Sequence, residues 1–309
     1  MQRDQCAEFA LRIVSEKRFQ CPARAESNFF SAGFFNCRDK LGINLQARAA
    51  QRHQRNRGKR IRCGGEHSGG RPRCLLSGRL PVQHQHAEFA ARFMAARTIG
   101  GDMYDFLHYD SHRTGIALGD ASGKAAPAAL YAALVSGIMR AAAPRALHPE
   151  EMLRLLNDSL QERRVDAQYV TMVYAVWNDE DQTLEISNAG AVQPLICRNG
   201  EVETIHAEGF PLGLFPDVSY EQFTLSTRPG DSVIFFSDGL ADAQNPAGEM
   251  FGTEQLTELV QQHASLSAGE LADLIMAAIS EFQNGAEHFD DETLIVLRVR
   301  EAFDAPPTG

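Results

Sequence analysis

The sequence predicts an α/β (α+β) protein in which antiparallel sheets are covered by helices. Two observations support this fold class. Short apolar runs recur at the spacing of hairpins, and the helical segments come in two pairs instead of alternating singly with strands. Regular βαβ units with a parallel sheet are therefore not expected. The length of 309 residues fits one large domain or two ordinary ones.

Charge is divided unevenly along the chain. Residues 1–86 contain 17 of the 30 Lys and Arg but only 6 of the 40 Asp and Glu, so this leader carries +11 and the remainder carries −21. Residues 48–79 are rich in Arg and Gly and have almost no apolar periodicity. Such a composition cannot bury enough surface to offset its ordering entropy. We expect a largely disordered basic leader over 1–86, an ordered domain over 87–300 and a frayed tail over 301–309.

The sequence favours a cytoplasmic protein without a membrane span. No run approaches the roughly 18 consecutive apolar residues that a transmembrane helix needs. The N-terminus has charges through its apolar part and lacks the core of a signal peptide. Five of the six cysteines lie in the leader, which leaves Cys197 alone in the domain, so disulfides are not expected to stabilise it.

Helices are expected where apolar residues repeat at helical spacing. In the leader, apolar residues near helical spacing are compatible with a short amphipathic helix within residues 1–17. In the domain, a proline in the first turn marks a helix over 127–142, and an apolar face marks another over 149–163. A second pair is expected at 253–263 and 268–282.

Strands are expected where an apolar or alternating run is bounded by turn residues. They cover residues 87–96, 113–118, 169–177, 183–187, 194–198, 201–205, 221–225, 232–237 and 293–300. Asn199-Gly200 predicts a tight hairpin turn between two of them. Gly119-Asp120 predicts a turn directly after the strand at 113–118.

Four aspartates lie in similar local settings. They are Asp102 in IGGDMYDF, Asp120 in ALGDASGK, Asp238 in FFSDGLAD and Asp290 in HFDDETLIV. Small neighbours let the backbone approach a ligand closely. Carboxylates that gather at a sheet edge repel one another unless a cation lies among them, and the hard cations Mg²⁺, Mn²⁺ and Ca²⁺ prefer oxygen ligands. Any one of these residues also fits an ordinary turn, but the four together predict a metal site.

Six segments, in this order, resemble the SpoIIE-like branch of the PPM family of metal-dependent Ser/Thr protein phosphatases: IGGDMYDF, GDASGKAAPAAL, SNAGAVQPL, PLGLF, FFSDGLADAQNPAGEMFG and DDETLIVLR. The resemblance covers residues 87–300. It implies a PPM-type α/β/β/α sandwich of two antiparallel sheets flanked by helix pairs. It also implies two Mn²⁺ or Mg²⁺ ions at one edge of the sheets. The implied ligands are Asp102, Asp120, the backbone carbonyl of Ala121, Asp238 and Asp290, with Asp291 as the register alternative to Asp290.

The resemblance further implies an activity. Two cations would polarise a water that attacks phosphoserine or phosphothreonine on a protein, without a covalent phosphoenzyme. The implied substrate is a phosphorylated anti-sigma-factor antagonist or a similar small regulatory protein. One departure concerns position 191, where the family usually has His after Asn-Ala-Gly and this chain has Ala191. Because the aspartates are intact, we expect activity to survive.

Four further residues near these motifs have two interpretations each. Lys124 could meet a phosphate at a helix N-terminus or be a solvated lysine. Asp105 and Asp242 could orient a ligand or a water, or could be turn and cap residues. Asn188 could support the site through hydrogen bonds or be a simple turn residue.

Three alternative interpretations remain open at the level of sequence. Two of them concern the function, and the third concerns whether part of the leader is a coding segment. Ala191 favours a non-catalytic pseudophosphatase that binds phosphoproteins or regulators. The basic leader could make the chain a nucleic-acid-associated regulator, although it lacks interleaved aromatic residues and a recognisable module, so nucleic acid is not the expected partner. Residues 18–80 could also be an out-of-frame translation, because relatives have an amphipathic helix there and only Leu80-Pro81 matches its end. The oligomeric state is not predicted.

Overall fold

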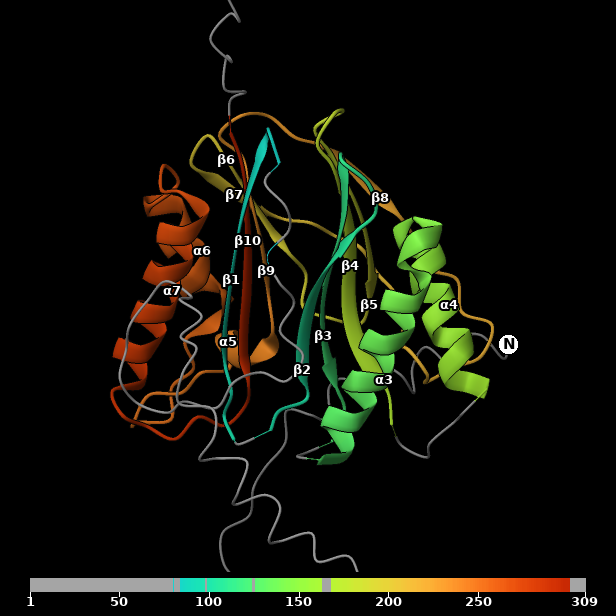
Figure 1. Cartoon of the computed structure of the whole chain (residues 1–309). Helices are drawn as coiled ribbons and strands as arrows, with labels where there is room; N and C mark the ends of the chain where they lie inside the picture. Colours follow the sequence, from blue (N-terminus) through green and yellow to red (C-terminus); the bar gives the residue numbers. More distant parts are fainter. Residues whose placement is uncertain (1–79, 81–83, 98, 124–125, 163–167, 301–309) are drawn as a thin grey trace, which may run out of the picture. The chain divides into compact units, whose positions relative to one another are not determined.

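The computed structural model describes Leu80 and residues 84–97, 99–123, 126–162 and 168–300 (Figure 1). All of them belong to one compact unit. The candidate helix within residues 1–17, most of the basic leader and the tail over 301–309 lie outside the described residues.

Strands and helices lie close to the predicted positions. The strands are β1 (Ala87–Met94), β2 (Asp102–His108), β3 (Arg113–Ala121), β4 (Val170–Asn178), β5 (Thr183–Ala189), β6 (Leu195–Arg198), β7 (Glu201–Thr204), β8 (Phe223–Ser226), β9 (Ser232–Phe236) and β10 (Glu292–Val299). The helices are α3 (Ala126–Ala142), the 3₁₀ turn η1 (Ala143–Arg145), α4 (Pro149–Glu162), α5 (Asp238–Ala241), α6 (Gly252–Gln262) and α7 (Ala268–Gln283).

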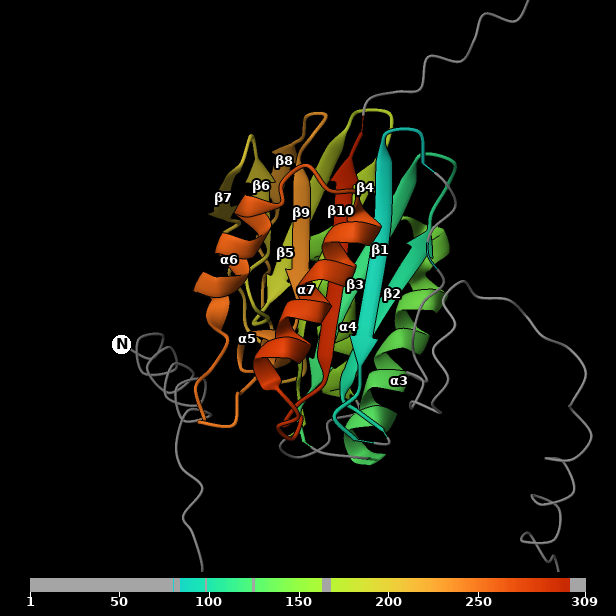
Figure 2. The same ribbon diagram turned by 90° about the vertical axis from the view of Figure 1, so that its left-hand side faces the viewer.

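The strands form two antiparallel sheets that face each other. Sheet A has the order β2-β3-β4-β5-β8, and sheet B has the order β1-β10-β9-β6-β7. Figure 1 shows α3 and α4 on the outer face of sheet A and α6 and α7 on the outer face of sheet B. Figure 2 looks onto the sheet B side, where α7 crosses β1 and β10. The predicted α/β/β/α sandwich with two helix pairs is confirmed.

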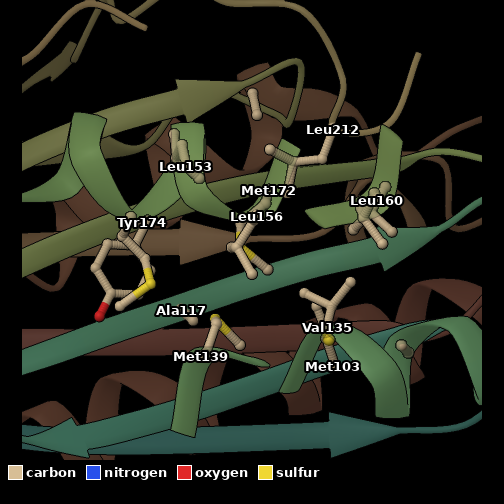
Figure 3. Close-up of a cluster of buried hydrophobic side chains, with 14 of the residues drawn as sticks. Met103, Ala117, Val135, Met139, Leu153, Leu156, Leu160, Met172, Tyr174 and Leu212 are labelled. Carbon is tan, nitrogen blue, oxygen red and sulfur yellow. The ribbon is translucent and has the colours of Figure 1, made fainter. Parts of the chain in front are cut away.

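Three apolar clusters hold the four layers together. One lies between α3, α4 and sheet A, the second lies between the two sheets, and the third lies between sheet B and α6 and α7. Figure 3 shows the first cluster, in which Met103 and Met172 of sheet A meet Val135 and Met139 of α3. These side chains are nearly inaccessible to solvent. Their burial stabilises the fold by about 1.5–3 kcal/mol per large side chain.

Three local differences separate the structure from the predicted elements. The first is β2, which lies outside the predicted strand ranges. The second is that Gly119 and Asp120 do not form a turn, because β3 continues to Ala121 and keeps pairing with β4 up to Val170. The third is the short helix α5, which starts at Asp238 shortly after β9 and was not predicted. The predicted Asn199-Gly200 turn is present, with φ of 54° and 81°. Those left-handed values suit Asn and Gly in a two-residue hairpin.

One described helical stretch, 126–145, is long and apolar enough to cross a membrane by length and composition. It comprises α3 and η1. The buried residues of α3 include Tyr131, Val135 and Met139, which belong to the cluster against sheet A. Packing in the core of the sandwich therefore accounts for these three apolar residues.

Residues 84–86, which the prediction assigned to the leader, are packed against the domain. Their anchor is Asp179, which is 5% exposed. Its carboxylate accepts hydrogen bonds from the backbone N–H groups of Gln85 (2.8 Å) and His86 (3.0 Å) and from the indole of Trp177 (3.1 Å). The His84 ring bonds to Thr114, and burial lowers the pKa of this histidine. The ordered domain therefore begins before Ala87.

Replacing Asp179 with Ala should destabilise the domain and alter the environment of its only tryptophan. The change leaves the buried indole N–H of Trp177 and two partly buried backbone N–H donors without their acceptor. Each such loss at a buried group costs about 1–3 kcal/mol. We expect a reduction of about 2–4 kcal/mol in the free energy of unfolding, measured by urea titration of Trp177 fluorescence. Asp181→Ala, in the nearby exposed turn, is the control. Equal effects from both substitutions would contradict the anchoring role.

Candidate metal and phosphate site

Four chain segments that carry the predicted aspartates come together at one end of the sandwich. Asp102 begins β2 and is the direct Cα partner of Asp120 near the end of β3. From the other sheet, the Thr293 hydroxyl donates a 2.5 Å hydrogen bond to the Asp102 carboxylate. This bond links the start of β10 to the start of β2. Residues that are far apart in sequence, in two different sheets, therefore meet at Asp102.

Ser237 joins the Asp238 segment to the same place. Its backbone N–H donates to the carbonyl of Thr293 (2.9 Å), and its hydroxyl donates to the carbonyl of Asp291 (3.1 Å). The same hydroxyl accepts from the N–H of Thr293 (3.0 Å). At Gly239, an added Cβ would lie 2.0 Å from the Asp291 carbonyl oxygen. The residue after Asp238 must therefore be glycine for α5 to lie against the start of β10.

The carboxylate of Asp102 is in an unfavourable environment for a negative charge. The residue is 4% exposed. Burial is the main reason that its pKa is well above its usual range, and the nearby charge of Asp120 raises it further. Hydrogen bonds from Thr293 and Ser237 act in the opposite direction. A buried, hydrogen-bonded carboxylate beside a second one is an arrangement that a divalent cation would stabilise.

Asp290 and Asp291 have different environments. Asp291 is buried, and its carboxylate accepts from the backbone N–H groups of Ala96 (2.9 Å) and Asp102 (3.3 Å). Asp290 is exposed and accepts only a local hydrogen bond, from the N–H of Asp291 (2.9 Å), among those resolved for its side chain. Asp291 thus anchors the loop before β2. This difference favours Asp290 over the register alternative, although ligation itself stays a prediction.

The atoms around Gly101 show whether the predicted ligand oxygens are of the kind that a cation prefers. A Cβ added to Gly101 would lie 2.7 Å from the carbonyl oxygen of Ala121 and 2.9 Å from Oδ1 of Asp120. Two of the predicted ligand oxygens therefore face the same side-chain-free position. Carbonyl and carboxylate oxygens are the donors that Mg²⁺ and Mn²⁺ accept, so the donor chemistry fits.

The described residues contain no group of three or more His, Cys, Asp or Glu side chains close enough to hold a metal ion as they stand. Side chains alone therefore do not complete a site in this arrangement. A site for Mg²⁺ needs few of them, because the ion usually keeps several waters and accepts backbone carbonyls. Repulsion between ionised carboxylates also disfavours closer approach without a cation.

Replacing Gly101 with Ala should disturb this end of the sandwich. The new methyl group would press on the Ala121 carbonyl and the Asp120 carboxylate, and we expect phosphatase activity to fall by about 10–100-fold. The matched control is Gly137→Ala on the exposed face of α3, where an added Cβ meets nothing within 4 Å. That change should raise the free energy of unfolding by about 0.5–1 kcal/mol. Assays of activity and of urea unfolding on both variants check the prediction, and full activity in Gly101→Ala would contradict it.

Asn188 lies in β5, so the interpretation as a left-handed turn residue is wrong. Its side chain is fully buried. Its Oδ1 accepts from the N–H of Ala191 (2.7 Å) and its Nδ2 donates to the Ala191 carbonyl (3.1 Å). Asn188 therefore fixes the loop that follows β5, including the position where the family usually has His. The left-handed residue of this loop is Gly190, with φ of 75°.

Asp105 does not orient Asp102, because successive side chains of a strand point to opposite faces. Its carboxylate instead faces α3, where Arg140 donates to it (2.8 Å) and Ser136 lies at 3.5 Å. Burial raises the pKa of Asp105, while the charge of Arg140 lowers it. Asp242 is exposed and caps α5, with its N–H donating to the carbonyl of Asp238. Lys124 lies outside the described residues.

Sequence reasoning missed Gly101, Ser237 and Thr293 as residues that arrange the site. All three lie in segments already singled out by their aspartates. Strand alternation from Asp291 places Thr293 on the face of β10 toward the second sheet. That pattern could have indicated Thr293, whereas the contact between Gly101 and Ala121 depends on tertiary structure.

Comparisons with known proteins show which family the chain resembles. The family model described as "Stage II sporulation protein E (SpoIIE)" matches residues 110–300. The chain is 31% identical over 256 residues to "Phosphoserine phosphatase RsbU" of Bacillus subtilis (strain 168), covering 81% of this chain and 75% of RsbU.

Solved structures show the same fold. The PP2C phosphatase domain of SpoIIE from Bacillus subtilis, solved with a fragment of its regulatory domain, has a TM-score of 0.63 at 19% identity. The match covers 71% of this chain and 63% of that one. The catalytic domain of the Ser/Thr phosphatase PstP, solved with two manganese ions, has a TM-score of 0.54 at 17% identity. It covers 70% and 99% of the two chains. The family-model match and the similarity to RsbU together show that this chain belongs to the SpoIIE family, within the PPM-type protein phosphatases.

Proposed function

We propose that the chain hydrolyses phosphoserine or phosphothreonine on a protein in a reaction that depends on Mn²⁺ or Mg²⁺. The observation that carries this proposal is the convergence of Asp102, Asp120 and the segment Ser237–Asp238 at one end of the sandwich. Membership of the SpoIIE family supports it.

Two cations are proposed, held by Asp102, Asp120, the Ala121 carbonyl, Asp238 and Asp290. When bound there, such ions would lower the pKa of water and neutralise negative charge on the phosphoryl oxygens. PstP, which has the same fold, was solved with two manganese ions, and this supports the number proposed.

The chain's own residues would arrange the ligands before a substrate arrives. Thr293 and Ser237 fix the orientation of Asp102 through hydrogen bonds. Asp291 fixes the backbone that leads into Asp102 by accepting from two N–H groups. Preorganisation of this kind removes the cost of ordering the ligands during the reaction.

The proposed substrate is a phosphorylated anti-sigma-factor antagonist or a similar small regulatory protein in the cytoplasm. RsbU, the relative at 31% identity, is named a phosphoserine phosphatase. A structural neighbour with a TM-score of 0.50 comes from work on the bacterial stressosome, a modular signalling system. Both relations favour a regulatory phosphoprotein over a metabolite.

Hydrolysis of p-nitrophenyl phosphate separates an enzyme from the pseudophosphatase alternative that Ala191 suggests. We expect hydrolysis with Mn²⁺ and none in EDTA. The mechanism needs no histidine at position 191 to hold the proposed cations, so the unaltered chain should turn over. Binding of phosphoproteins without hydrolysis at any Mn²⁺ concentration would support the pseudophosphatase instead.

A further inference from the structure

We propose that Ile99 and Phe289 form an apolar docking patch, beside the predicted carboxylate site, for a folded phosphoprotein with apolar side chains flanking its phosphoserine. The inference rests on the proposed function and names the surface that its protein substrate would contact. Phe289 directly precedes Asp290, and Ile99 lies in the loop between β1 and β2 that leads to Asp102.

Both side chains are exposed although they are strongly apolar. Phe289 is 63% exposed and Ile99 is 37% exposed. A single exposed apolar residue is ordinary on a protein surface. Here two such residues, Ile99 and Phe289, come from different loops on the same edge of the molecule. Together they indicate a shared role more strongly than either residue does alone.

The chain is anchored on both sides of Phe289. On one side, the ring of His288 bonds to the carboxylate of Glu292 (2.9 Å), which also accepts from Gln283 (2.6 Å). Glu292 and Gln283 are buried, at 2% and 3% exposed. On the other side, Asp291 is buried and accepts from two backbone N–H groups. Phe289 lies between two anchored residues and cannot easily turn into the core.

Asp291 also holds the loop of Ile99 against the loop of Phe289. A Cβ added to Gly100 would lie 1.6 Å from Oδ2 of Asp291, so the backbone next to Ile99 packs directly on that carboxylate. Asp291 also accepts from the N–H of Ala96, near the start of the Ile99 loop. The two loops are therefore joined at Asp291, and the patch is preorganised instead of assembled on binding.

The position of the patch beside the predicted carboxylate site indicates which kind of molecule would bind to it. A phosphate that reaches Asp102 and Asp290 must be presented from the surface that surrounds them. The Ile99 loop leads into Asp102, and the Phe289 loop contains Asp290. A small phosphate ester would not extend over the loops. A folded protein would, and burial of apolar side chains at its contact would contribute to affinity.

The test compares Phe289→Ser and Ile99→Ser with the matched control Phe223→Ser. Phe223 is 44% exposed on β8, the edge strand of sheet A farthest from β2. The readout is kcat/KM for a phosphorylated anti-sigma-factor antagonist divided by kcat/KM for p-nitrophenyl phosphate. Dividing by the small substrate removes any disturbance of the catalytic machinery or the fold that a substitution causes.

We expect the ratio to fall by about tenfold in each patch variant through a higher KM for the phosphoprotein, and to stay unchanged in Phe223→Ser. An unchanged ratio in both patch variants, or an equal fall in the control, would overturn the patch. Loss of self-association in Phe289→Ser at an unchanged ratio, seen by sedimentation, would assign the surface to a second copy of the chain instead. If the unaltered chain hydrolyses neither substrate with Mn²⁺, the proposed function fails, and the docking role fails with it.

Discussion

Replacing Asp120 or Asp238 with Asn should abolish phosphate release while leaving the fold intact. Each substitution keeps the shape of the side chain but removes the negative charge that would hold a cation. If the cations supply about 4 kcal/mol of transition-state stabilisation, their loss slows the reaction by about a thousandfold. Hydrolysis of p-nitrophenyl phosphate at saturating Mn²⁺ measures the effect, and thermal unfolding reports on the fold.

The matched control for these two variants is Asp181→Asn. Asp181 lies in the turn between β4 and β5, at the opposite end of β4 from Val170, which is paired with Ala121. It is exposed, and its charge is distant from the predicted ligands. Full activity in the control is expected. Full activity in Asp120→Asn or Asp238→Asn would contradict the two-cation assignment while leaving the fold assignment untouched.

Mn²⁺ should stabilise the chain markedly, and Asp102→Asn should remove this effect. A ligand present at a hundred times its Kd, bound only by the folded state, adds about 2.7 kcal/mol of stability. For a domain of this size that corresponds to a rise in Tm of about 5–10 °C. Differential scanning fluorimetry with Mn²⁺ and with EDTA measures the shift in Tm of the unaltered chain and that of Asp102→Asn.

The same variant should have a higher Tm than the unaltered chain when both are in EDTA. Burial and the charge of Asp120 raise the pKa of Asp102 above its ordinary value of 3.8. A carboxyl group whose pKa is raised by folding contributes its full stabilisation of the folded state when the pH is below its ordinary pKa. This stabilisation is lost as the pH rises through the raised pKa. Asn mimics the protonated form at every pH, so its advantage should grow with pH. An Asp102→Asn variant that is less stable than the unaltered chain at neutral pH in EDTA would contradict the electrostatic account.

The sandwich was predictable because its periodic features are local. The apolar face of α4 and the hairpin residues Asn199-Gly200 are written in short segments and lie where they were predicted. The continuation of β3 through Asp120 was not predictable in this way. It depends on pairing with Val170 and Thr171, which are about fifty residues away in sequence.

The same distinction between local features and contacts of distant segments applies to the site. The aspartates could be singled out because their small neighbours recur in the sequence. Strand alternation indicates the face of β10 on which Thr293 lies, but its contact with Asp102 could not be predicted, since Thr293 lies 191 positions away and belongs to the other sheet. For Asp105, proximity in sequence left a role at the site open, and strand alternation turns its side chain to Arg140 instead.

Phosphate release from a phosphorylated anti-sigma-factor antagonist, followed in one assay with Mn²⁺ and with EDTA, tests the central claim most directly. The account predicts release with Mn²⁺, none in EDTA, and recovery when Mn²⁺ is added in excess over the chelator. Equal release in EDTA, or no release from any phosphoserine protein with Mn²⁺ present, would contradict it.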